Sequence, residues 1–179
     1  MANDWQTIKE NLKYSDSRFK IYENDVITPD DKSLKLKKIS ITPGVHIVAL
    51  TPDRKIPLVK QYRYPAGDYS IEIPSGGVDV TSETFMQAGK RELQEETGYI
   101  AEDLQFVGRL SHNPSLDFIY EIYFAKNIKL ADQKLDASEC GTEVILLSYE
   151  ECLDRISSGA IKDSSTIACL AFCHQKNLI

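Results

Sequence analysis

Three carboxylates stand close together in the segment RELQEETG, residues 91–98, which is rich in residues that favour helices. Glu92, Glu95 and Glu96 have the spacing i, i+3 and i+4, so on a helix their side chains share one flank and reach a common point. Like charges at this spacing destabilise an isolated helix by a few tenths of a kcal/mol per pair. Oxygen ligands of this kind suit hard cations such as Mg²⁺ or Mn²⁺, which would offset the repulsion. The spacing therefore predicts a divalent-cation site along this helix.

A row of glutamates is more often only the solvated face of a helix, and this is the alternative interpretation. The flanking residues indicate a helix with defined ends. Gly98 suits a left-handed terminal position, and Glu83 precedes the segment where the helix dipole favours an anion. Phe85, Ala88 and Leu93 supply an apolar stripe for burial.

The protein carries 27 acidic and 21 basic side chains over 179 residues, a formal net charge of −6. This balance argues against a broad nucleic-acid-binding surface and against attraction to anionic membranes. A polyanionic small substrate is also repelled unless cations accompany it. Because Mg²⁺ is commonly held by a few carboxylates together with substrate phosphates, we expect this acidic protein to hold a pyrophosphate through divalent ions.

The sequence also bears on the compartment. No apolar run approaches the roughly 20 residues that a membrane span needs, and the first residues lack the apolar core of a signal peptide. The four cysteines, at positions 140, 152, 169 and 173, show no C-x-x-C pairing. Cys169 and Cys173 are expected on a buried helix face. We therefore expect a cytoplasmic protein with reduced thiols and without a membrane or nucleic-acid partner.

Residues 1–43 differ in pattern from the rest of the chain and are expected to form a small antiparallel strand unit. Two alternating stretches, RFKIYENDVIT and SLKLKKISIT, predict half-buried strands, and TPDDKS between them is typical of a turn. A unit of two or three strands is marginal alone. It is therefore expected to pack on the main domain or on a second subunit.

Residues 44–179 are predicted to form the main domain. Strands are expected at VHIVALT, IPLVKQYRY and YSIEIP before the glutamate helix, and at LQFVGRLS, FIYEIYFAKNI and EVILLS after it. Two C-terminal helices are expected at SYEECLDRISSG and DSSTIACLAFCHQ. This order of elements predicts an α/β (α+β) layered domain with a mixed sheet.

The pattern G-x5-E-x7-R-E-L-Q-E-E-T-G, from Gly77 to Gly98, resembles the signature of the Nudix hydrolase family. Every fixed position of that signature is matched, and Tyr99 stands where the signature has an aliphatic residue. The resemblance implies an α/β/α sandwich with a mixed central sheet for residues 44–179. It also implies an enzyme that hydrolyses a nucleoside diphosphate linked to another moiety.

The resemblance implies a role for each matching residue. Glu92, Glu95 and Glu96, with the carbonyl of Gly76, would hold Mg²⁺ or Mn²⁺, and Arg91 would orient the glutamates.

The resemblance places the catalytic base elsewhere, in the loop KLDASECGTEV. That loop offers two candidates, Glu139 and Glu143, and we prefer Glu139. Glu83 would anchor the loop before the helix onto the helix.

Residues 60–78 resemble the corresponding run of ADP-ribose and nucleoside-diphosphate-sugar pyrophosphatases. Pro114, sixteen residues beyond Gly98, matches a proline associated with ADP-ribose preference in that group. By this resemblance Arg63, Glu72 and Pro114 are candidate substrate-binding residues. The alternatives are a structural salt bridge for Arg63 and an exposed strand position for Glu72.

The expected reaction is hydrolysis of ADP-ribose to AMP and ribose 5-phosphate. GDP-mannose or another nucleoside-diphosphate sugar is the alternative substrate, and a domain that binds a nucleotide sugar without turnover is the alternative class. The strand unit of residues 1–43 resembles a segment that such enzymes exchange across a homodimer, so a homodimer is expected.

Overall fold

The computed structural model describes residues 4–111, 113, 115–133 and 141–179. The chain divides into two units. Unit 1 comprises Met1–Pro43 and Ser111–Ile119, and unit 2 comprises Gly44–Leu110 and Tyr120–Ile179. None of the helices in the described ranges has the length and apolar character needed to span a bilayer.

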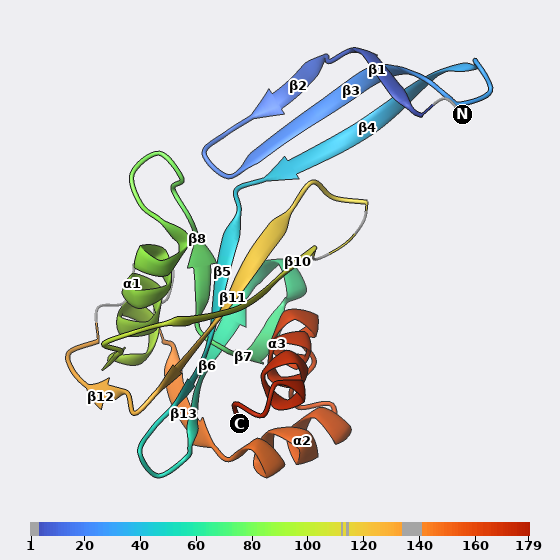
Figure 1. Cartoon of the computed structure of the whole chain (residues 1–179). Coiled ribbons are helices and arrows are strands. Elements are labelled where there is room, and N and C mark those ends of the chain that lie inside the picture. The colour runs from blue at the N-terminus through green and yellow to red at the C-terminus, as the bar shows by residue number, and fades with distance from the viewer. Residues whose placement is uncertain (1–3, 112, 114, 134–140) are drawn as a thin grey trace. The chain divides into compact units, whose positions relative to one another are not determined.

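Unit 1 is a four-stranded antiparallel sheet (Figure 1). The two predicted strands are β3 (Phe19–Ile27) and β4 (Ser33–Ile41), which pair along their full length. The other edge of β3 pairs with two short strands, β1 (Gln6–Lys9) and β2 (Leu12–Ser15). The sequence analysis did not predict these two strands.

The two faces of this sheet differ in chemistry. The register places Val26 opposite Leu34 and Leu12 opposite Tyr22, so apolar side chains share one face. Leu12, Leu34 and Leu36 are 53%, 41% and 42% exposed. The other face carries the ion pair between Lys35 and Asp25, together with the apolar pairs Phe19–Ile41 and Ile21–Ile39. Three partly exposed leucines therefore lie on one face of the sheet, which Tyr22 and Lys38 share.

Unit 2 contains a central sheet with the order β10–β11–β5–β8. These strands are β5 (Gly44–Leu50), β8 (Ser75–Gly77), β10 (Gln105–Ser111) and β11 (Ile119–Lys126). β5 runs parallel to β11 and antiparallel to β8, so the sheet is mixed, as predicted.

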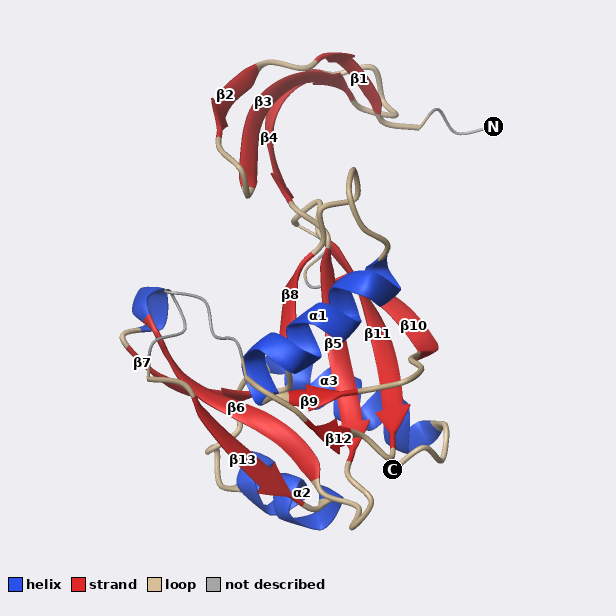
Figure 2. Ribbon diagram, turned by 90° about the vertical axis from the view of Figure 1, so that its left-hand side faces the viewer, coloured by secondary structure: helices blue, strands red, loops and turns tan. Residues whose placement is uncertain are grey.

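A second sheet of unit 2 has the order β13–β6–β7 and is antiparallel (Figure 2). Its strands are β6 (Ile56–Arg63), β7 (Asp68–Glu72) and β13 (Glu143–Leu147). A 3-10 turn, Tyr64–Ala66, joins β6 to β7, and β9 (Tyr99–Ile100) pairs with β12 (Lys129–Leu130).

The helices form the outer layers of unit 2. α1 (Phe85–Thr97) packs on one face of the central sheet, and α3 (Ser164–Gln175) packs on the other (Figure 1). α2 (Tyr149–Ser157) lies beside β13. Leu93 of α1 is fully buried against Val45 and Ile47 of β5, and Cys169 and Cys173 of α3 are buried as predicted. The predicted α/β/α sandwich is confirmed.

The ends of α1 hold the glutamate segment in place. Its N-terminus is closed by a capping box, in which Thr84 and Gln87 bond reciprocally. Its C-terminus ends at Gly98, whose φ of 72° is the left-handed conformation expected there. Glu83 lies just outside the helix, before the capping residue.

Candidate active site

Strand β8 brings the glycine pair against the glutamates of α1. Pairing of Val45 with Gly76 aligns β8 on the central sheet. A Cβ atom added to Gly76 would lie 2.0 Å from Glu92 Oε1, far inside van der Waals contact. The Glu92 carboxylate therefore occupies the space that any other residue at position 76 would fill, beside the backbone that the sequence analysis assigned as a metal ligand.

Two of the three glutamates are buried. Glu92 is 8% exposed and Glu96 is 3% exposed, whereas Glu95 is partly buried. Glu96 accepts a hydrogen bond from the backbone N–H of Ser75 at 2.9 Å. The solvated-face interpretation of this helix is therefore wrong, since a solvated face does not bury its carboxylates.

Arg91 lies among the glutamates and places a positive charge against three of their carboxylates. Its Nη1 donates to Glu92 at 2.7 Å and to Glu95 at 2.9 Å. Its Nε and Nη2 donate to Glu83 at 3.2 and 2.8 Å, and Nη2 also reaches the carbonyl of Gly77 at 3.2 Å. These bonds, that to Glu83 first, raise the pKa of Arg91 above its ordinary value. One guanidinium thus joins the helix to the loop before it.

The donor set fits a hard divalent cation in chemistry, because carboxylates and a backbone carbonyl are all oxygen ligands. Within the described ranges, however, no three acidic, histidine or cysteine side chains converge on a point that could hold an ion. Arg91 bonds both Glu92 and Glu95, while Glu96 is turned to Ser75. The guanidinium therefore takes up carboxylate oxygens that a metal would need.

The two predicted substrate-binding residues on the second sheet bond each other. Arg63 Nε donates to Glu72 Oε1 at 3.0 Å, and Nη2 donates to Oε2. The Glu72 side chain is 11% exposed and that of Arg63 is 42% exposed. The hydrogen bond to Glu72 is the main cause that raises the pKa of Arg63, and the negative charges of Glu72 and Glu96 raise it further. The structural salt bridge is therefore present, and Glu72 is not on an exposed strand face.

The remaining predicted residues lie elsewhere. Glu139, the preferred catalytic base, and Pro114 fall outside the described residues. Glu143 begins β13 opposite Lys60, and the two side chains form an exposed ion pair at 3.5 Å. Alternation along β6 directs Lys60 and Arg63 to opposite faces of the sheet. Glu143 therefore lies on the face away from the Arg63–Glu72 pair.

Gln61, which was not predicted as a site residue, shares the strand face of Arg63. It is 5% exposed, and its Nε2 has no hydrogen-bond partner among the described residues. The period of two in KQYR was enough to put the glutamine and the arginine on one face. Its burial was not visible in the sequence.

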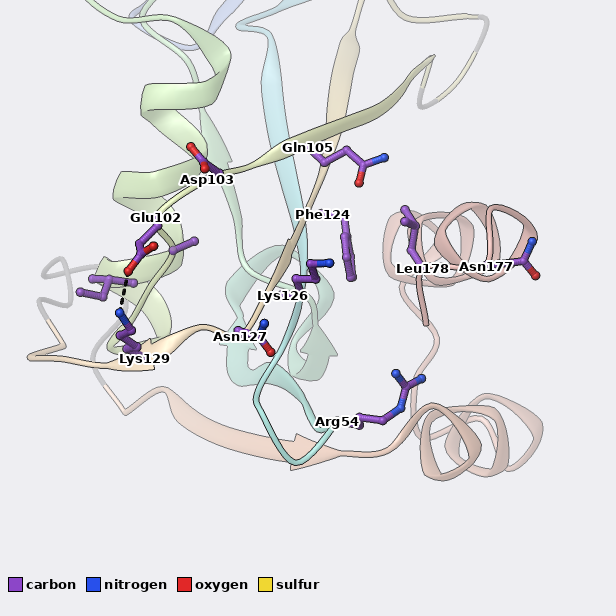
Figure 3. A pocket seen from close by; sticks show the side chains of 12 residues that line it. Arg54, Glu102, Asp103, Gln105, Phe124, Lys126, Asn127, Lys129, Asn177 and Leu178 are labelled. Atoms are coloured by element: carbon purple, nitrogen blue, oxygen red, sulfur yellow. Dashed lines mark hydrogen bonds and ion pairs between the residues drawn. The ribbon is translucent and has the colours of Figure 1, made fainter.

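A pocket of about 780 Å³ lies elsewhere in unit 2 (Figure 3). It lies between the β5–β6 turn, the segment after α1, the end of β11 and the end of the chain. Exposed charges line it, and Lys129 forms an ion pair with Glu102 at 2.6 Å. None of the predicted site residues that the structure describes lines this pocket.

Comparison with known proteins adds four findings. Residues 41–154 match the NUDIX domain. A methanol dehydrogenase activator from Bacillus methanolicus is 30% identical over 93% of this chain and 91% of its own length. An ADP-ribose pyrophosphatase from Bacillus subtilis (strain 168) is 29% identical over 97% of this chain and 95% of its own length. The crystal structure of an ADP compounds hydrolase superposes with a TM-score of 0.86 at 17% identity, over 100% of this chain and 99% of that one.

Gly76→Ala tests the contact between β8 and α1. The added methyl group collides with the Glu92 carboxylate, so this predicted ligand is displaced, and we expect affinity for Mn²⁺ to fall at least about tenfold. Isothermal titration with Mn²⁺ measures the loss. Ser75→Ala is the matched control, because it keeps the backbone N–H that bonds Glu96. Equal Mn²⁺ affinity in Gly76→Ala and the parent protein would contradict the assignment.

Arg91→Met tests the electrostatic role of the guanidinium. The hydrogen bond from Arg91 is the main cause that holds the pKa of Glu83 below its ordinary value. A lowered folded-state pKa gives stability that is complete above the ordinary pKa of about 4.5 and is lost as the pH falls through the folded-state value. Urea unfolding should therefore show a stability difference between parent and variant that is largest near neutral pH and shrinks below about pH 4.5. A difference independent of pH would argue against this pairing.

Proposed function

This chain belongs to the Nudix family of pyrophosphohydrolases, and we propose that it hydrolyses ADP-ribose to AMP and ribose 5-phosphate with Mg²⁺ or Mn²⁺ as cofactor. The observation that carries the proposal is the buried carboxylate group of α1 packed against Gly76, in a chain that satisfies every fixed position of the family signature. The near full-length similarity to a protein named ADP-ribose pyrophosphatase supports the choice of substrate.

The proposed reaction adds water across the pyrophosphate. The water oxygen forms a bond to one phosphorus, the bridging P–O bond breaks, and two monophosphates leave. Glu92, Glu95, Glu96 and the carbonyl of Gly76 would hold the divalent cation. When bound, that cation polarises phosphoryl oxygens and lowers the pKa of a water molecule.

The residues beside these proposed cation ligands have further roles in the proposed mechanism. Arg91 would keep Glu92 and Glu95 oriented, and the carboxylate oxygens that it bonds in the free protein would have to pass to the cation. Glu139 is the proposed base that takes the proton from the attacking water. Arg63 would bind a substrate phosphate, for which it must leave Glu72.

Incubation of the purified protein with ADP-ribose and Mg²⁺ should release AMP, and a chelator should stop the reaction. Glu96→Gln should lower kcat at least about a hundredfold, because the amide is a poor cation ligand. It should still fold, since its side-chain oxygen can accept the Ser75 hydrogen bond. Glu102→Gln, at an exposed position, is the control. Near-normal turnover by Glu96→Gln would contradict the cation site, and faster hydrolysis of GDP-mannose would contradict the substrate.

We also propose that unit 1 pairs with a second copy of the chain. Its apolar face carries Leu12, Leu34 and Leu36, all more than a third exposed. An exposed apolar sheet face of this kind is typical of a protein–protein interface, and an isologous contact between two copies covers it on both.

Leu36→Asp should dissociate this dimer, because it buries an unpaired charge in the interface. Sedimentation velocity at matched concentrations measures the change in mass. Ser33→Asp introduces the same charge on the opposite face of β4 and should leave the dimer intact. A monomeric parent protein, or a Leu36→Asp variant that remains dimeric, would contradict the proposed interface.

A further inference from the structure

The amide of Gln61 is buried on the strand face that carries the Arg63–Glu72 ion pair. Its Nε2 is enclosed, and no hydrogen-bond acceptor among the described residues reaches it. Burial of an amide donor without a partner is unfavourable, and native proteins rarely retain one. A second arrangement of the neighbouring side chains that uses this donor would explain why it is there.

The register of β6 and β7 puts Gln61 in the middle of the Arg63–Glu72 ion pair. Residues opposite each other on antiparallel strands point to the same face. Three successive rows of this face are Arg63–Asp68, Gln61–Ser70 and Val59–Glu72. The side chains of Arg63 and Glu72 therefore meet across the row that contains Gln61.

The two partners of this ion pair differ in exposure. The Arg63 side chain is 42% exposed and can turn towards an anionic ligand, whereas the Glu72 side chain is 11% exposed. If Arg63 leaves, Glu72 remains as a buried carboxylate that has lost its cation, which is strongly unfavourable. A replacement donor must then lie within reach. Gln61 is the diagonal cross-strand neighbour of Glu72, at a distance that long side chains span.

We propose that Gln61 is a positioning residue that permits Arg63 to exchange Glu72 for a phosphate of the substrate. In the free protein Arg63 bonds Glu72, and Gln61 Nε2 has no hydrogen-bond partner among the described residues. In the complex Arg63 bonds the phosphate, and Gln61 Nε2 donates to the Glu72 carboxylate in its place. The identity of the phosphate ligand rests on the proposed function, whereas the exchange concerns only Gln61, Arg63 and Glu72.

A stability cycle without any substrate tests the exchange by itself. Arg63→Met releases Glu72, so the Gln61 amide should then bond it. The loss of Tm caused by Arg63→Met should be larger by about 4 °C in a Gln61→Leu background than in the parent background. Gln61→Leu alone should cost little, because its amide has no partner in the parent protein. Equal losses in the two backgrounds would overturn the proposal.

Should the double variant fail to fold, the side-chain amide signals of Gln61 give the same answer. These ¹H–¹⁵N signals are identified by their absence from the spectrum of Gln61→Leu. In Arg63→Met they should move downfield and exchange with solvent more slowly, as expected for a donor to a carboxylate. Signals at their parent positions in Arg63→Met would overturn the proposal.

The kinetic arm uses ADP-ribose with Mg²⁺. Gln61→Leu should raise KM about tenfold with kcat within about twofold, because release of Arg63 becomes unfavourable before chemistry begins. In a Glu72→Gln background the same substitution should have little effect, since no buried carboxylate is then left uncompensated. Gln105→Leu, on an exposed part of β10, is the control for loss of an amide.

These experiments distinguish a failure of the proposed exchange at Gln61 from a failure of the proposed function. An unchanged KM in Gln61→Leu, or an equal rise of KM in both backgrounds, would overturn the exchange. A parent protein that does not hydrolyse ADP-ribose would contradict the proposed substrate, and the stability cycle would still decide the exchange.

Discussion

The burial of carboxylates between α1 and β8 is the constraint on which the rest of the site depends. Glu92 and Glu96 are almost fully enclosed, and a buried carboxylate is tolerated only when hydrogen bonds or cations compensate it. The backbone N–H of Ser75 and the guanidinium of Arg91 supply this compensation, and the glycine at position 76 leaves the space that the Glu92 carboxylate occupies. Arg91 comes from α1 itself, whereas Ser75 and Gly76 come from β8, which packs on α1. The site and the fold are therefore specified together.

Two arginines in this region bond carboxylates, and they differ in the number of bonds that hold each of them. Arg91 bonds three glutamates and the backbone of Gly77, so the loss of any one bond leaves the others in place. Arg63 bonds Glu72 alone among the described carboxylates. The first group is therefore suited to holding the helix on its loop, and the second is suited to exchanging a partner.

Much of this arrangement follows from sequence periodicity and spacing. The i, i+3, i+4 pattern correctly grouped the glutamates on one helix, and Gly98 correctly ended it, because both depend on local geometry. The alternation of β3 and β4 likewise predicted an antiparallel pair. The capping box of Thr84 and Gln87 is also a local signal in the sequence, but the start of the helix was predicted from Glu83 instead.

The properties that were not predictable arise from tertiary packing. Spacing alone does not tell whether a glutamate row faces water or a neighbouring strand, and only the approach of β8 buries Glu92 and Glu96. The choice between a substrate contact and a salt bridge for Arg63 depended on Glu72, nine residues away across a turn. β1 and β2 are too short to show an alternating pattern, so their pairing with β3 had no clear signal.

The chemistry of position 61 explains why the second ion pair can be mobile. A lysine there would bind Glu72 permanently and would add a fixed cation near the site intended for divalent ions. A leucine would leave the carboxylate with Arg63 as its only available donor and would hold the arginine in place. A glutamine carries no charge, so it does not compete with Arg63 while the arginine is bound, yet it can donate a hydrogen bond once the arginine leaves. A neutral donor beneath a charged pair thus lowers the cost of breaking that pair without weakening it beforehand.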